Sequence, residues 1–182
     1  MSGDAGGPPA GRSELGRSTR HMSAAEVVAL NEELDRLLLV ALARADLEER
    51  PESPDSWGGI EVAAHLAEFP RFFAEELKRL SADAAAIIGR THEHEARLNA
   101  IAAARFLDRA QVKADVETAF AGLAAQLQRL TDTDISRVTN NVKNGEEPLS
   151  AFLDRYVIGH KAGHLRQLEE LHGGGGDEKE RT

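Results

Sequence analysis

The sequence predicts an all-α protein of one domain, a four-helix bundle within a chain of 182 residues. Two observations support this prediction. Aromatic residues make up only 4% of the chain, and the helix-favouring Ala, Leu, Glu and Arg outweigh the residue types that favour strands. Four segments also carry apolar residues at helical spacing. An apolar content of 41% is enough for one sizeable core.

Both ends of the chain are predicted to be disordered tails. Residues 1–22 are rich in Gly, Pro, Ser and Arg and lack the apolar core of a secretory signal. Because Met22 stands just before the first helical pattern, residues 1–21 are compatible with a mis-assigned start, an expression remnant or a native tail. Residues 173–182 open with glycines and have nothing to bury. The bundle should therefore span residues 23–172.

The first two helices follow from capping and periodicity. The first should begin at the capping box that starts with Ser23 and continue up to the break at Pro51. The second opens near Ile60, and His65 lies on or beside its apolar stripe. Pro70 stands in the middle of this pattern and should kink or split the helix. Such a break would displace His65 by part of a turn.

A long crossover is expected between the second and third helices. Residues 81–109 contain short Ala-rich pieces and a polar run, which indicates one or two short helices at most. The third helix should run from about residue 111 to residue 130. A polar loop through Asn144 and Gly145 follows it.

The fourth helix carries the most informative pattern. Pro148 opens it, and His160 and His164 occupy inward positions where a bundle normally places leucine. Imidazoles four residues apart share one helix face and can converge on one ion, and His65 from a facing helix would complete a three-histidine site with open positions. The alternative is a core histidine hydrogen-bonded to a carbonyl or carboxylate. Since the chain has no cysteine, any metal must rest on histidines and carboxylates.

The other histidines are expected in solvent. His92 and His94 are two residues apart in a polar stretch, so on a helix they point away from each other. His21 and His172 belong to the tails. The predicted metal site therefore uses three of the seven histidines of the chain.

Two side chains are candidates for supporting the histidines from a second layer. Glu61 and Tyr156 each lie four residues before a histidine of their own helix, on the right face to hydrogen-bond an imidazole or a bound water. Glu61 has an alternative role at the helix N-terminus, where an acid complements the dipole. We expect Lys161 and Arg166 on a charged solvent face, with contact to an anionic substrate as the alternative. Trp57 is expected as a cap on the bundle end, with a substrate contact as the alternative.

Several function classes are disfavoured. A net charge of −9 opposes binding to nucleic acid or to anionic membranes. No apolar run is long enough to span a bilayer, and the motifs of phosphate loops, dinucleotide folds, zinc fingers and serine or cysteine nucleophiles are absent. We therefore expect a cytoplasmic protein whose chemistry rests on histidine, with no organic cofactor and no assigned catalytic side chain.

Two segments, WGGIEVAAHLAEF and GEEPLSAFLDRYVIGHKAGHLRQLEEL, resemble the signature segments of the DinB-like (DinB/YfiT) superfamily. The resemblance covers nearly all of Ser23 to Leu171. It implies an up-and-down four-helix bundle with a long crossover between helices 2 and 3. It also implies a divalent metal held by His65, His160 and His164, with zinc or nickel first and iron or manganese as further candidates.

The resemblance implies a function class but no substrate. Characterised relatives include transferases and isomerases that depend on mycothiol, bacillithiol or glutathione. A metal-dependent enzyme is therefore expected, such as a thiol-dependent S-transferase that takes a small-molecule substrate and a low-molecular-weight thiol. Because the chain has no cysteine, that thiol must be external. The alternatives are a metal-dependent hydrolase and a non-catalytic metal-binding or partner-binding bundle. A homodimer remains open.

Overall fold

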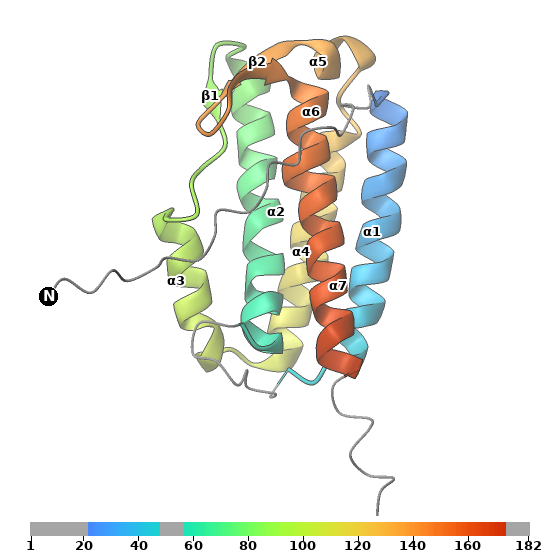
Figure 1. The fold of residues 1–182 in the computed structure, drawn as a ribbon, viewed down its shortest axis with the longest axis vertical. Coiled ribbons are helices and arrows are strands. Elements are labelled where there is room, and N and C mark those ends of the chain that lie inside the picture. Colours follow the sequence, from blue (N-terminus) through green and yellow to red (C-terminus); the bar gives the residue numbers. More distant parts are fainter. Residues whose placement is uncertain (1–21, 48–56, 174–182) are drawn as a thin grey trace, which may run out of the picture.

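The structure, a computed structural model, describes residues 22–47 and 57–173. Four helical rods form the predicted bundle (Figure 1). They are α1 (Ala24–Arg44), α2 (Gly59–Ala82), α4 (Arg109–Leu127), and a fourth rod made of α6 (Leu149–Leu153), a π-helical turn (Asp154–Ile158) and α7 (Gly159–Gly173). The expected tails lie outside the described residues, except for Met22, whose side chain is buried, and Gly173, which ends α7.

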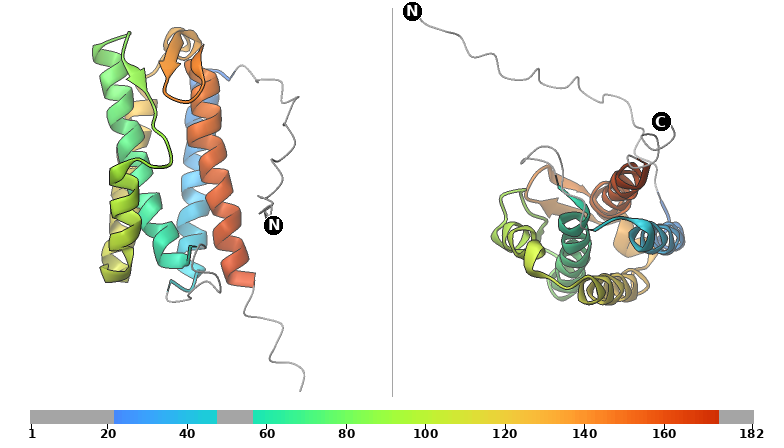
Figure 2. Two further views of the ribbon diagram at one scale, coloured as in Figure 1. Left: turned by 60° about the vertical axis from the view of Figure 1, so that its left-hand side comes forward. Right: turned by 90° about the horizontal axis from the view of Figure 1, so that it is seen from below.

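The helices are packed in an order that the crossover explains. α1 lies beside α4 and α7, and α2 packs on α4 and α7. Figure 1 shows α1 and α7 running down while α2 and α4 both run up. The chain must therefore return along the length of the bundle between α2 and α4, and Figure 2 shows this crossover on the outside of α2. It contains β1 (Ile87–Ile88), α3 (Glu95–Ala103) and a short 3₁₀ turn (Ala104–Phe106).

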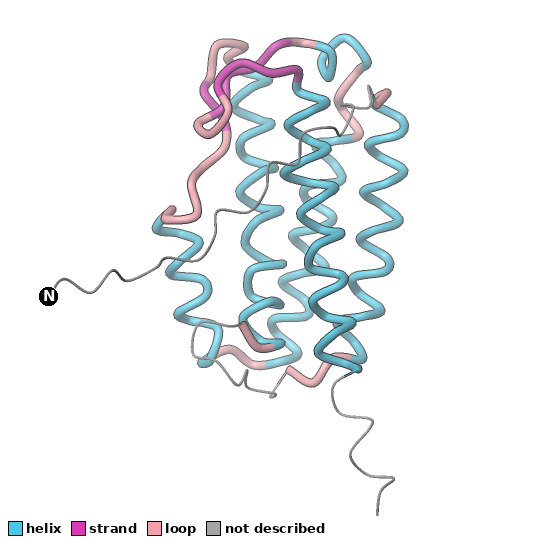
Figure 3. The backbone as a smooth tube through the Cα atoms, viewed as in Figure 1, coloured by secondary structure: helices cyan, strands magenta, loops and turns pink. Residues whose placement is uncertain are grey.

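A small sheet covers one end of the bundle, where a polar loop alone was expected (Figure 3). The strand order is β1, β2 (Val138–Asn141), β3 (Gly145–Pro148), with β1 parallel to β2 and β2 antiparallel to β3. The short helix α5 (Asp132–Ser136) precedes it. Gly145 turns the hairpin with a φ of 72°. Strands of two to four residues are too short for the alternation by which a strand is recognised in a sequence.

The limits of the helices follow local chemistry. α1 begins at the predicted capping box, in which Ser23 Oγ accepts from the Glu26 N–H at 3.2 Å and the Glu26 carboxylate accepts from the Ser23 N–H at 2.8 Å. It ends at Arg44, earlier than expected, and Pro51 lies outside the described residues. α2 continues through Pro70 as one helix, so of the two expected effects of this proline the split does not occur, while the kink stays a prediction. Its long buried stripe holds the two halves against the bundle despite the missing N–H.

The core contains one charged group that the sequence analysis misplaced. Lys161 was expected in solvent, but its side chain is 0% exposed, while Arg166 is exposed as expected. The Lys161 Nζ donates to Asn31 Oδ1 at 2.6 Å and to the Asp35 carboxylate on α1. Burial lowers the pKa of Lys161 and raises the pKa of Asp35, and each partner opposes the shift of the other. This pair joins α1 to α7 inside the core.

The fourth rod is not a regular α-helix along its whole length. At the π-helical turn Asp154–Ile158 the Gly159 N–H bonds to the Asp154 carbonyl, five residues back instead of four. The turn directly precedes His160. Within the described residues, no helix has the combination of length and apolar character needed to cross a membrane.

Candidate metal centre

The three inward histidines meet between α2 and α7. The His160 Nε2 lies 3.0 Å from the His65 Nε2 and 3.2 Å from the His164 Nε2. One nitrogen from each of the three rings falls within 4.8 Å of the others. α7 contributes two rings from successive turns, and α2, which continues through Pro70, contributes the third from the facing helix.

Aromatic side chains enclose this cluster. The Trp57 ring centroid lies 5.1 Å from that of His65 and stacks at 6.2 Å on His164, and the Phe69 ring lies 4.7 Å from His160. Trp57 is thus more than a cap on the bundle end. His65 is 2% and His164 8% exposed, while His160 is half-buried. His160 is therefore the histidine through which the site opens to solvent.

The outer ring nitrogens fix the proton positions. The His164 Nδ1 lies 3.0 Å from Gln167 Oε1, and the buried His65 Nδ1 lies 3.6 Å from a Glu68 carboxylate oxygen. The Gln167 oxygen accepts a hydrogen bond, so the His164 Nδ1 carries the proton and its Nε2 presents a lone pair. Among the described residues the His65 Nδ1 has no hydrogen-bond partner, and the nearby Glu68 carboxylate favours the same tautomer of His65 through its charge. A neutral His160 has a single N–H and cannot satisfy two lone pairs at once. At least two of the three facing nitrogens therefore meet with lone pairs and no proton between them. A divalent cation bound among the three nitrogens would satisfy all of these lone pairs.

The electrostatics of the site favour the neutral, ligating form of each imidazole. Burial, together with the charges that His164 and His65 would carry, lowers the pKa of His160 to about 2. Burial lowers the pKa of His164 to about 4, and it also lowers the pKa of His65. The three rings are therefore neutral at physiological pH, which is the protonation state that binds metals.

Glu68 is held as an anion behind His65. Arg90 binds it through both guanidinium arms, with its Nη2 at 2.5 Å from Glu68 Oε2. Burial acts to raise the pKa of Glu68, but the hydrogen bonds and charge of Arg90 and of His65 outweigh it and lower the pKa to about 2. The sequence analysis missed Glu68 and Gln167. Each lies three residues after a histidine, a spacing that also shares a helix face and could have revealed them.

The two predicted supporting residues hydrogen-bond to groups other than the histidines. The Glu61 carboxylate accepts from the Gly58 N–H at 3.1 Å, which is the helix-capping alternative. The Tyr156 hydroxyl accepts from Asn144 Nδ2 at 3.1 Å. Within residues 22–47 and 57–173, no hydrogen bond joins either side chain to a histidine.

The remaining histidines differ from one another. His92 is exposed, as expected. His94 was expected in solvent, but it is half-buried at the start of α3, with its ring 5.4 Å from Phe72. The crossover folds back on α2, and this packing covers part of His94 although the polar stretch around it has no apolar pattern of its own. His172 lies in the last turn of α7, and His21 lies outside the described residues.

A cavity of about 290 Å³ opens beside the cluster. His65 and His160 form one wall, and the rings of Phe69, Phe73 and Tyr156 form another. A molecule in this cavity would contact the half-buried His160 directly. The cavity therefore gives the histidine cluster access to a small substrate.

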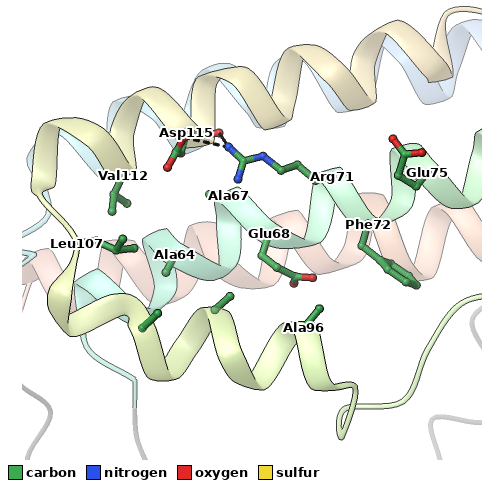
Figure 4. A pocket seen from close by; sticks show the side chains of 12 residues that line it. Ala64, Ala67, Glu68, Arg71, Phe72, Glu75, Ala96, Leu107, Val112 and Asp115 are labelled. Atoms are coloured by element: carbon green, nitrogen blue, oxygen red, sulfur yellow. Dashed lines mark hydrogen bonds and ion pairs between the residues drawn. The ribbon is translucent and has the colours of Figure 1, made fainter.

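A larger cavity of about 490 Å³ lies between α2, α3 and α4 (Figure 4). Alanines line much of it, and the Arg71–Asp115 ion pair, at 3.1 Å, stands at one side. No histidine of the described chain lines it. Its charged side chains do not converge with the histidine cluster, whereas the smaller cavity contacts that cluster directly and is therefore the candidate site.

Three solved structures share this fold. YfiT from Bacillus subtilis, described as a probable metal-dependent hydrolase with an unusual four-helix bundle topology, has a TM-score of 0.65 and 18% identity over 89% of this chain and 91% of its own. A mycothiol-dependent maleylpyruvate isomerase has a TM-score of 0.64 and 16% identity, covering 85% of this chain and 63% of its own. An uncharacterized protein from Clostridium difficile 630 has a TM-score of 0.62 and 7% identity over 81% of this chain and 94% of its own.

These similarities establish the fold. The chain spans just under two thirds of the length of the isomerase. No family model matches the chain, and no curated protein matches it.

Proposed function

We propose that this chain is a divalent-metal-dependent enzyme that acts on a small molecule. Its fold, which is the fold of the DinB/YfiT-like superfamily, supports this proposal. The observation that carries the proposal is the meeting of three neutral imidazole nitrogens with too few protons to satisfy one another. His65, His160 and His164 would hold the ion. Imidazole donors favour zinc or nickel, with iron or manganese as further candidates.

The residues around the site have defined roles in this proposal. A divalent ion bound there would act as a Lewis acid that makes a small thiol or a water molecule more acidic. Glu68 and Gln167 hold two of the imidazoles in the tautomer that directs Nε2 inward. Trp57 and Phe69 shield the cluster from water, so that a substrate must approach past His160. Three protein ligands leave positions open, as reactive sites require.

Thiol-dependent group transfer is the activity we propose first. The chain has no cysteine, so an external thiol is the simplest nucleophile for the site to activate. A mycothiol-dependent isomerase among the similar structures supports this choice. Hydrolysis is the second candidate, supported by the description of YfiT as a metal-dependent hydrolase. A non-catalytic metal-binding or partner-binding bundle is the third.

Elemental analysis of the purified protein tests the metal directly. We expect about one divalent ion per chain, lost in each of the His65→Ala, His160→Ala and His164→Ala variants. His92→Ala is the matched control, because this histidine borders the same cavity but lies outside the cluster. Circular dichroism should report a folded bundle in each variant. Equal metal loss in the control, or full retention in all three variants, would exclude the site.

Cobalt substitution separates the activities. If thiol transfer is correct, mycothiol, bacillithiol or glutathione should produce sulfur-to-cobalt charge-transfer absorption, and the holo protein should then consume an electrophile such as a chlorinated nitroarene. If no thiol changes the cobalt absorption spectrum and the metal-loaded protein cleaves an ester or amide, the protein is a hydrolase. A holo protein that does neither belongs to the non-catalytic class.

A further inference from the structure

We propose that the cavity beside the histidines binds an organic acid, with its carboxylate held between Arg97 and Lys143. This inference rests on the proposed function and deepens it, because it names the substrate class of the same site.

The side chains that line the cavity carry positive charge, although the net charge of the protein is negative. Among residues 22–47 and 57–173, four cationic side chains border it, from Arg90, Arg97, Lys143 and Arg155, and no Asp or Glu does, although the whole chain carries a net charge of −9. Such a concentration of one sign in a concave, partly apolar site focuses the field on ligands of opposite charge.

Two of the four cations are already neutralised. Arg90 is bound through both arms to Glu68, and the Arg155 Nη1 lies 2.9 Å from Glu147. Arg97 and Lys143 differ from them, because within the described part of the chain neither forms an ion pair with a carboxylate. Two positive charges in the cavity are therefore left for a ligand.

These two side chains reach the cavity from separate elements. Arg97 stands on α3, half-buried, with its guanidinium 4.9 Å from the centre of the Trp57 ring, and its Nη1 donates to the His92 carbonyl at 2.8 Å. Of its five N–H groups this uses one. Lys143 lies in the turn between β2 and β3, with its Nζ 5.6 Å from the centre of the Tyr156 ring. The crossover and the hairpin thus bring one free cation each to the same cavity.

The aromatic wall decides the kind of anion. A bare inorganic ion would leave the rings of Phe69, Phe73 and Tyr156 uncovered, whereas an organic acid can place its carbon skeleton on them. A volume of about 290 Å³ limits the ligand to a small molecule. His65 and His160 line the same cavity, so a molecule whose carboxylate is held by Arg97 and Lys143 lies beside the histidine cluster.

A carboxylate could come from two sources, the acceptor substrate or the thiol cosubstrate. Three probes separate these sources. Succinate has carboxylates and no thiol, 2-mercaptoethanol has a thiol and no carboxylate, and mercaptosuccinate has both groups. Trp57 is the only tryptophan of the chain and lies beneath Arg97, so its fluorescence should report the binding, with calorimetry as a second readout.

We expect succinate to bind the metal-free and the zinc-loaded protein, and neutral succinamide to bind at least tenfold more weakly. Arg97→Gln and Lys143→Gln should each reduce the succinate affinity roughly tenfold or more, the effect of losing one charge-assisted hydrogen bond. Arg105→Gln and Lys113→Gln are matched controls that should change nothing. Arg105 likewise lies 5.0 Å from a ring, that of Phe106, and Lys113 is exposed on α4.

Mercaptosuccinate identifies the source. If mercaptosuccinate binds more tightly than succinate, and does so only in the zinc-loaded protein, the carboxylate and the thiol belong to one cosubstrate. If mercaptosuccinate and succinate bind with equal affinity, the carboxylate belongs to the acceptor substrate. Both outcomes support the inference. Equal affinity for succinamide, or equal loss in Arg97→Gln and Arg105→Gln, overturns it. Because metal content is measured separately on the same variants and should be unchanged, failure of the metal site is distinguishable from failure of the carboxylate site.

Discussion

Removal of the buried ammonium group of Lys161 should be among the most destabilising single changes in this bundle. Its side chain is 0% exposed and lies against the Asp35 carboxylate on α1. In Lys161→Met the Asp35 carboxylate would keep one side-chain partner, the amide of Asn31 at 2.9 Å, and would lie in the core without a counter-charge. Truncating one partner of a buried ion pair costs about 3–5 kcal/mol of unfolding free energy.

The double variant separates the charge effect from packing. With Asp35→Leu added to Lys161→Met, no buried charge remains at this position, and replacement of both partners by apolar residues is often neutral or stabilising. We therefore expect the double variant to recover most of the loss, to within roughly 1–2 kcal/mol of the wild type. Chemical denaturation of the wild type and the single and double variants measures these differences, with exposed Lys113→Met as the matched control.

The pH dependence has a definite sign. Burial raises the pKa of Asp35, and Lys161 opposes this shift, so its removal should raise that pKa further. At pH values above about 4, the ordinary pKa of an aspartate, and below the raised pKa of Asp35, the folded variant holds a proton that the unfolded chain has released. Stability then falls as pH rises, by at most about 1.4 kcal/mol per pH unit. The loss relative to the wild type should be smaller at pH 4.5 than at pH 7. A pH-independent loss, or a double variant as unstable as the single one, would refute the reasoning.

Three further predictions concern the site and its frame. The pKa of His160 is lowered to about 2 and that of His164 to about 4, so at pH 5 the unfolded chain binds protons that the folded chain does not. The unfolding free energy of the metal-free protein, measured by chemical denaturation, should therefore fall by on the order of 1–2 kcal/mol per histidine between pH 7 and pH 5. An unfolding free energy that does not change with pH would contradict this. Glu68→Gln should weaken zinc binding about 10- to 100-fold in a chelator competition, and unchanged affinity would show that the carboxylate does not orient the imidazole behind it. Gly59→Ala would place a Cβ 2.7 Å from a backbone carbonyl oxygen and should destabilise by about 1–3 kcal/mol, whereas Gly122→Ala, with open space around it, should not.

The sequence predicts those features that depend on neighbours along one helix. The spacing of His160 and His164 and the apolar stripe around His65 indicate a shared interior face, and the structure brings the three rings together. Capping at Ser23 likewise depends on four consecutive residues and was predicted correctly. Periodicity acts over a few residues, so it remains visible without knowledge of the fold.

Features that depend on distant partners could not be predicted in this way. The burial of Lys161 is decided by Asp35, which is 126 positions away in the sequence. Arg97 stands in a polar stretch with no periodic pattern, and only the return of the crossover along α2 brings it to the cavity. Pro70 was expected to kink or split α2 and does not split it, because the local preference for a break is visible in the sequence while the packing that holds the helix together is not.

The π-helical turn before His160 has a consequence for how such a site can change. A helix that takes up one additional residue in a widened turn keeps both flanking segments docked in place. Loss of one residue between Asp154 and Ile158 would give a regular helix with the same flanks, and only the side chains of that turn, Arg155 and Tyr156 among them, would be redirected. A single-codon insertion or deletion could thus alter which molecules the cavity accepts while leaving the histidines untouched, so that specificity and ion binding can evolve along one helix independently.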